Sequence, residues 1–136
     1  MTQRFYTLAA ALLAATALMV AQSGRTIQVD VTYTGSGTVD AGHKIYVNLW
    51  PSADIGTGPP VDMQSLASKS GTVTFENVTV PAYISTTYDP TGVWDAQSAP
   101  PSGSSLGMYG KPDPINVAPG KTTKITLTFN DEYTKP

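Results

Sequence analysis

Aromatic residues in a polar stretch are the first candidates for binding chemistry in this sequence. Trp94 follows the turn-forming residues 89–92 and precedes a long segment rich in glycine, proline and serine. A flat aromatic ring can cover the apolar face of a pyranose, while polar groups beside it bind the sugar's hydroxyls. Trp94 could instead pin the long loop to the domain. The candidate ligand-binding residues are Tyr88, Trp94, Asp95 and Tyr109.

Carboxylates in the same stretch raise the question of a metal site. Asp89 and Asp95, with Asp113 or backbone carbonyls, offer the hard oxygen ligands that calcium prefers. Residues 89–92 also fit a β-turn, because aspartate is favoured at its first position and proline at its second. We favour the turn and keep calcium as the alternative. The chain has no cysteine and one histidine, so ligands for zinc or copper are few.

Residues 103–107, Gly-Ser-Ser-Leu-Gly, match the G-x-S-x-G pattern of a nucleophilic serine. That pattern requires a strand before the serine and a helix after it, and the sequence predicts neither at this position. His43 is the only histidine, and it lies upstream of the serine. We therefore expect a flexible loop here, no catalytic residues and a protein that is not an enzyme.

The charge balance argues against nucleic acid as a partner. Eight Lys and Arg residues and ten Asp and Glu residues give a net charge of -2, and the basic residues form no block. Nucleic-acid binding depends on a concentrated positive surface that displaces counterions from phosphates. The expected partner is a protein or a polysaccharide, and the sequence does not identify which.

The first 23 residues are predicted to be a secretory signal peptide. A basic residue, Arg4, precedes an apolar run from Leu8 to Ala21, and a small-x-small pattern ends at Ser23. The run is shorter than the roughly 20 apolar residues that a membrane-spanning helix needs. We expect cleavage after Ser23, no stable membrane span and a secreted product, extracellular or periplasmic.

Residues 24–136 show the two-residue alternation of apolar and polar side chains that is typical of β-strands. The expected strands lie within residues 26–33, 44–50, 61–66, 71–80, 82–88, 115–117 and 122–129. Segment 61–66 could also be a short helical turn, and a turn or bulge is expected to divide 71–80. Residues 89–114 carry too much Gly, Pro and Ser for regular structure, and they are predicted to be one long loop.

These elements must position the candidate residues. About seven short strands separated by turns predict an all-β fold, a single β-sandwich with Greek-key-like connections over residues 24–136. The strands at 26–33 and 122–129 contain one charge each, Asp30 and Lys124. Exposed edge strands with so few charges invite pairing with another chain, which would make a homo-oligomer or a docking subunit.

Three segments share their pattern with a known group of sandwiches. They are 71–75 (Gly-Thr-Val-Thr-Phe), 81–83 (Pro-Ala-Tyr) and 117–123 (Val-Ala-Pro-Gly-Lys-Thr-Thr). This set resembles the carboxypeptidase-regulatory-like and transthyretin-like domains of secreted bacterial proteins, although Ala82 stands where the family has glycine. The resemblance implies a non-catalytic accessory or surface domain, and it names no ligand.

The sequence thus predicts a secreted, non-catalytic module with a binding or structural role at or outside the cell surface. One alternative is a carbohydrate-binding module that uses Trp94 and neighbouring loop residues. The other is a subunit that assembles with itself or with a partner through exposed edge strands.

Overall fold

Seven β-strands form the fold in the computed structural model, which describes residues 24–110 and 113–136. In chain order they are β1 (Thr26–Tyr33), β2 (Ile45–Trp50), β3 (Asp62–Leu66), β4 (Ser70–Phe75), β5 (Tyr83–Tyr88), β6 (Ser105–Met108) and β7 (Thr122–Phe129). The predicted signal peptide, residues 1–23, lies outside the described residues. The described ranges contain no helix, so the prediction of an all-β fold is confirmed. A helix long and apolar enough to cross a membrane is likewise not found in those ranges.

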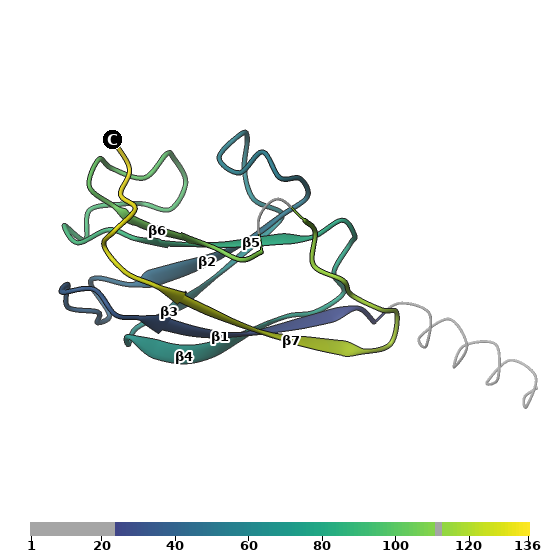
Figure 1. Ribbon diagram of the computed structural model, residues 1–136. Helices are drawn as coiled ribbons and strands as arrows, with labels where there is room; N and C mark the ends of the chain where they lie inside the picture. Colours follow the sequence, from purple (N-terminus) through teal and green to yellow (C-terminus); the bar gives the residue numbers. More distant parts are fainter. Residues whose placement is uncertain (1–23, 111–112) are drawn as a thin grey trace, which may run out of the picture.

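The strands form two sheets that face each other as the layers of a sandwich (Figure 1). The smaller sheet has the order β4-β1-β7, and the larger has the order β3-β2-β5-β6. β1 is antiparallel to β4 and parallel to β7, while every pair in the larger sheet is antiparallel. The parallel pair joins the first strand to the last, so its backbone hydrogen bonds hold the two ends of the domain together.

The core lies between the sheets and follows the predicted alternation. The buried apolar side chains on β1, β2 and β7 are Ile27, Val29, Val31, Tyr33, Ile45, Val47, Leu49, Ile125, Leu127 and Phe129. Each points to the same side of its strand because successive side chains of a strand alternate between faces. The inward-facing sets expected from the sequence are therefore confirmed.

The predicted number of strands is right, but one strand lies elsewhere. Residues 115–117 form no strand; Ile115 and Val117 fill the core from a connecting segment and are each 6% exposed. Conversely, β6 lies inside the stretch 89–114 that was predicted to be a single loop, and that prediction is wrong for these four residues. Gly107 is required within β6, because a Cβ there would collide with Thr86 and Phe129. A glycine that makes room for the core was thus mistaken for a loop residue.

Segments 61–66 and 71–80 also differ in detail from expectation. The first contains strand β3 and no helical turn. The second ends its strand at Phe75, and no further strand follows before Pro81, although Val78 is buried in the core. Asn77 adopts a positive φ of 53°, which turns the chain and lets Val78 point inward.

The edges of the sheets are not where the sequence placed them. β1 has a partner on each side, so the expectation of an exposed edge at 26–33 is wrong. β7 is an edge strand, as expected. The edge of β6 is covered by the last residues of the chain: Ser105 and Thr134 form an antiparallel bridge, and the amide of Leu106 donates to the carbonyl of Tyr133 over 2.9 Å.

The two outer faces of the sandwich differ in chemistry. On the smaller sheet the outward positions of β1 and β7 carry threonines together with Gln28, Asp30 and Lys124. On the larger sheet the outward positions of β2 and β5 are Tyr46, Asn48, Trp50, Tyr83, Ser85 and Thr87. Aromatic and amide side chains are thus concentrated on one face.

Candidate functional site

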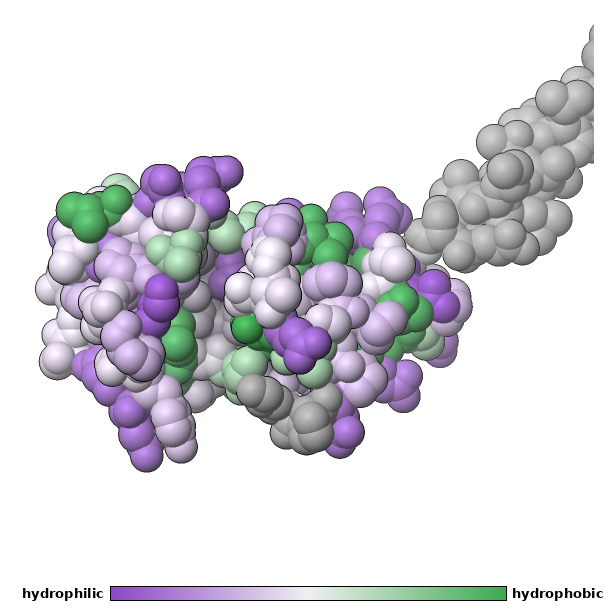
Figure 2. All heavy atoms as spheres, turned by 90° about the horizontal axis from the view of Figure 1, so that it is seen from above, coloured by the Kyte–Doolittle hydropathy of each residue, from purple (hydrophilic) through white to green (hydrophobic). Residues whose placement is uncertain are grey.

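The outer face of the larger sheet carries ordered rows of side chains that strand pairing brings together. One row runs across all four strands, from Met63 through Asn48 and Ser85 to Met108. Beside it, Tyr46 pairs with Thr87 and Trp50 pairs with Tyr83. Directly opposite residues on one face lie close enough for their side chains to interact. Connections 51–61 and 89–104 rise above this face in Figure 1, and Figure 2 looks down on it, where apolar residues lie among polar ones.

Asn48 lies at the centre of this face and lacks a full set of hydrogen bonds. Its Nδ2 donates to Ser85 Oγ and Thr87 Oγ1 over 3.4 Å each, and Trp50 Nε1 donates to the same serine oxygen over 2.8 Å. The side chain is 2% exposed, yet its Oδ1 has no partner among the described residues. A buried acceptor left without a donor is costly. This position is therefore open to a hydrogen-bond donor from outside the chain.

Trp94 packs against this face from the connection between β5 and β6. Its ring meets that of Tyr46 edge-on, with centroids 5.0 Å apart and an angle of 83° between the planes. Its Nε1 donates to the carbonyl of Ser98 over 2.9 Å, which closes a short turn of the same loop. Trp94 thus holds the loop on β2, in line with the structural role considered from the sequence. A small hollow beside the pair is lined in part by Lys44 and Asp89.

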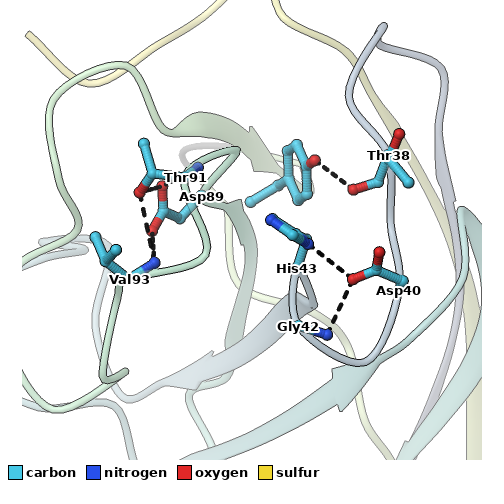
Figure 3. Close-up of polar contacts among 8 residues, drawn as sticks. Thr38, Asp40, Gly42, His43, Asp89, Thr91 and Val93 are labelled. Atoms are coloured by element: carbon cyan, nitrogen blue, oxygen red, sulfur yellow. Dashed lines mark hydrogen bonds and ion pairs between the residues drawn. The ribbon is translucent and has the colours of Figure 1, made fainter.

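Asp89 organises the start of this loop and is almost completely buried, at 4% exposed. Its Oδ1 accepts from the amide and hydroxyl of Thr91 at 2.9 and 2.7 Å, and its Oδ2 accepts from the amide of Val93 at 3.1 Å (Figure 3). The amide of Trp94 donates to the same Oδ2 over 2.9 Å. Burial by itself would raise the pKa of Asp89, but these hydrogen bonds outweigh it and hold the pKa below its ordinary value. The predicted turn at 89–92 is confirmed, and both oxygens of the carboxylate serve it.

Asp95 organises a second, separate turn. Its Oδ1 accepts from the amide of Gln97 at 2.9 Å and from the amide and hydroxyl of Ser98 at 3.2 and 2.9 Å. The bond from Gln97 is the main reason that the pKa of Asp95 lies below its ordinary value. Across residues 24–110 and 113–136 there is no group of three or more His, Cys, Asp or Glu side chains suited to a metal ion. A calcium ion at Asp89 would have to displace the four donors that hold the loop.

The structure does not bring the four predicted ligand-binding residues together. Tyr88 faces the core, is 1% exposed and donates its hydroxyl hydrogen to the carbonyl of Thr38 over 2.6 Å. Its burial raises the pKa of its phenol, and its ring has no face left for a ligand, so its assignment is corrected to a core residue. Tyr109 is partly buried and packs against the core. Trp94 and Asp95 lie in the loop, as expected.

The sequence contained a signal for the residues that the first selection missed. Residues 45–50 alternate, so the set Tyr46, Asn48 and Trp50 must face away from the core whenever Ile45, Val47 and Leu49 face toward it. An outward face that presents two aromatic rings and an amide is unusual beside the threonines on the opposite sheet. That contrast becomes visible only when strand order places β5 beside β2 and adds Tyr83 and Ser85.

His43 and Asp40 form a side-chain contact in the turn before β2. His43 Nδ1 lies 2.8 Å from Asp40 Oδ1, which also accepts from the amide of Gly42 over 2.9 Å (Figure 3). The contact with His43 is the main cause that lowers the pKa of Asp40. Gly92 lies so close to this turn that an added Cβ would come within 2.6 Å of the carbonyl oxygen of Gly42. The pair therefore supports the loop that carries Trp94.

Ser105, the central serine of the G-x-S-x-G pattern, lies in strand β6 and not at a turn between a strand and a helix. Its hydroxyl donates to Asp131 Oδ1 over 2.7 Å. The same carboxylate accepts from Tyr33 and from the amide and hydroxyl of Ser36. These residues line a hollow of about 150 Å³ at the end of the sandwich. Sequence reasoning had assigned no such role to Asp131.

Fold and site together define an all-β sandwich with an aromatic and amide-bearing outer face. No family model, no curated protein and no solved structure matches this chain. The function is therefore argued from the arrangement of its own residues.

Proposed function

We propose that this chain is a secreted, non-catalytic β-sandwich module, Ig-like or transthyretin-like, that binds carbohydrate on the outer face of its larger sheet. The observation that carries the proposal is the outward row of β2, where Asn48, whose Oδ1 has no partner among the described residues, alternates with Tyr46 and with Trp50, which is 8% exposed. A sugar presents both features that such a row can recognise. Its C–H face packs on aromatic rings, and its hydroxyls donate and accept hydrogen bonds.

Trp94 extends this surface toward the loop. In an edge-on pair, the ring that points its edge at its neighbour keeps both of its own faces clear of that contact. The pair of Trp94 and Tyr46 therefore leaves an aromatic face for a pyranose beside the hollow that Lys44 lines. The ammonium of Lys44 can donate to a sugar hydroxyl.

We propose no catalytic step. The hydroxyl of Ser105 is bound to Asp131, and His43 is paired with a different carboxylate, Asp40. The two residue types needed for a serine nucleophile and its base thus serve separate structural contacts. The resemblance of segments 71–75 and 117–123 to accessory domains of secreted proteins supports the same interpretation.

Affinity electrophoresis tests the proposal. Residues 24–136 would be run through native gels that contain soluble xylan, mixed-linkage β-glucan, galactomannan or pullulan, and positive hits would be quantified by titration calorimetry. We expect at least one polymer to retard the protein, and we expect Trp94→Ala to weaken binding about fivefold or more, because an aromatic contact contributes about 1 kcal/mol beyond its buried area.

Val93→Ala is the matched control, since Val93 belongs to the same loop, is 76% exposed and should not affect binding. Retardation by none of the four polymers, or equal binding by the Trp94 and Val93 variants, would contradict the proposal. Circular dichroism of each variant would verify that the sandwich is intact.

Self-assembly through an edge strand is the second candidate function, because β7 is an eight-residue edge strand with Lys124 as its only charge. Light scattering across a hundredfold concentration range tests it. A molar mass that rises with concentration, and that Thr126→Lys lowers, would support assembly. A constant monomer mass would exclude it.

A further inference from the structure

We infer that Asn48 is a ligand-binding residue on the outer face of the larger sheet, where its Oδ1 accepts a hydrogen bond from a hydroxyl of a neutral sugar. This inference deepens the proposed function and depends on it. It assigns the specific polar contact, the kind of group that meets it and the side chains that must move to admit it.

Two buried polar atoms lack a partner among the described residues, Asn48 Oδ1 and Thr86 Oγ1. Both lie on the larger sheet, but on opposite faces. Thr86 is paired with Val47 and points into the core, where nothing from solvent arrives. Asn48 is paired with Ser85 and points away from the core, toward the outer face of the sheet.

Polar side chains of β5 surround the amide of Asn48. Ser85 Oγ is already an acceptor for Trp50 Nε1, and the donors of Asn48 are directed to Ser85 and Thr87. The hydroxyls of Ser85 and Thr87 lie on the Nδ2 side of the amide, and no donor of the described residues lies within reach of its Oδ1. An acceptor between aromatic side chains favours a ligand that carries both an apolar face and a hydrogen-bond donor. A sugar hydroxyl is such a group, and a carboxylate is not, because it has no hydrogen to donate.

A ligand must pass neighbouring side chains to reach Asn48. Asn48 is 2% exposed, so side chains must move before a ligand can reach it. In its row it is flanked by methionines, with Met63 next to it on β3 and Met108 beyond Ser85 on β6. Met108 is 38% exposed. Methionine is unbranched and adapts its rotamers at low cost, so these two side chains can open the row without disturbing the strands.

The experiment compares the effects of one substitution on binding and on stability. Asn48→Leu removes the unpartnered oxygen and keeps a similar volume, so we expect it to leave the unfolding midpoint in urea unchanged or higher. The same variant should weaken binding at least tenfold to the polymer that retards the wild-type chain. Weaker binding without a loss of stability is expected if Asn48 contacts the ligand. If Asn48 had a structural role, the substitution would lower the unfolding midpoint as well.

Thr86→Val is the matched control, because it removes the other unpartnered oxygen on the inner face. It should raise the unfolding midpoint and leave binding unchanged. The ¹³C-methyl resonances of Met63 and Met108 should shift when wild-type protein is titrated with the polymer. Binding by Asn48→Leu at wild-type affinity, with no shift of those two resonances, would overturn the inference while leaving the proposed function intact. Absence of binding by the wild-type chain would overturn both.

Discussion

The hydroxyl of Tyr33 donates a hydrogen bond to Oδ1 of Asp131, joining the end of β1 to the residues that follow β7. The other oxygen of this carboxylate accepts from Ser36, and Ser105 of β6 donates to the first. One side chain thus ties three segments of both sheets together. The hydrogen bond from Tyr33 is the main reason that the pKa of Asp131 is lowered to about 2. A carboxyl group whose pKa is lower in the folded state stabilises the fold when it is charged.

Replacing Asp131 by asparagine should therefore destabilise the protein at neutral pH. We expect a loss of about 1 kcal/mol, which is the effect of the pKa shift after discounting for solvent screening at an exposed carboxylate. The contribution of Asp131 is complete above pH 4 and disappears as pH falls through 2, so the difference between variant and wild type should shrink over that window. Urea unfolding at pH 7, 4 and 2.5 measures it.

Glu132→Gln is the control for this prediction, since it removes the adjacent charge from an exposed side chain. It should change stability little at any of these pH values. A loss in Asp131→Asn that is the same at pH 7 and at pH 2.5 would show that the pH-dependent contribution belongs to other groups.

The carboxylate of Asp89 makes a sharper prediction, because it uses both of its oxygens. In Asp89→Asn the amide nitrogen would face N–H groups, either those of Val93 and Trp94 or those around Thr91. Leaving buried donors opposite another donor should cost about 3 kcal/mol. The loop should loosen as well, so the indole N–H resonance of Trp94 should move toward that of a solvated tryptophan.

Asp95→Asn provides the comparison. Asp95 accepts all of its hydrogen bonds on Oδ1, and an asparagine oxygen can replace that atom. We expect little change in stability, as for an ordinary surface substitution. Equal destabilisation by the two variants in urea unfolding would contradict this prediction. It would show that the loss of stability does not depend on whether one or both carboxylate oxygens accept hydrogen bonds.

The sequence predicted the sandwich because its largest strands bury one face and expose the other. Ile27 to Tyr33 and Ile125 to Phe129 alternate without interruption, and such a pattern fits only a half-buried strand. β6 was missed for a physical reason. Its inward position is Gly107, and a strand whose inward residue must be small for the core to pack resembles a loop in composition.

The candidate site was only partly predictable. Trp94 was selected because it lies in a polar loop, which local sequence reveals. Tyr88 was selected with it but shares the alternation of Ile84, and that alternation sends it into the core. The grouping of Asn48 with Ser85 depends on β2 pairing with β5 across 37 residues, and local patterns carry no information about that pairing.

The close approach of Gly92 to the turn at Gly42 predicts a position where a single methyl group matters. Gly92 has a φ of 71°, and an added Cβ would lie 2.6 Å from the Gly42 carbonyl oxygen and 2.9 Å from the ring of His43. Gly92→Ala should therefore cost about 2 kcal/mol or more, from backbone strain plus the collision. Thermal unfolding followed by circular dichroism measures the loss.

Gly103 offers the matched position, with a φ of 86° and nothing within 4 Å of an added Cβ. Gly103→Ala should show the cost of the backbone conformation alone, about 1 kcal/mol. If the two alanine variants melt at the same temperature, the packing of the loop on the turn contributes nothing, and the support that the turn gives to Trp94 is absent.

The last residues of the chain cover the edge of the larger sheet at β6. The amide of Lys135 donates to the carbonyl of Ser104 over 2.9 Å, and the carbonyl of Lys135 accepts from the amide of Gly103 over 2.8 Å. The carbonyl of Tyr133 accepts from the amide of Leu106. Tyr133 is 72% exposed, so its own side chain contributes little, while Lys135 Nζ donates to the carbonyl of Pro100 over 2.7 Å. Deleting residues 133–136 should remove about 2 kcal/mol of stability, as expected for three backbone hydrogen bonds, and should expose the edge of β6. Hydrogen exchange at the amides of Gly103 and Leu106 should speed up by tenfold or more, and light scattering should detect association. Tyr133→Ala keeps the backbone bonds and should behave as wild type, whereas a deleted chain with wild-type exchange at these two amides would mean that the segment does not cover the edge in solution.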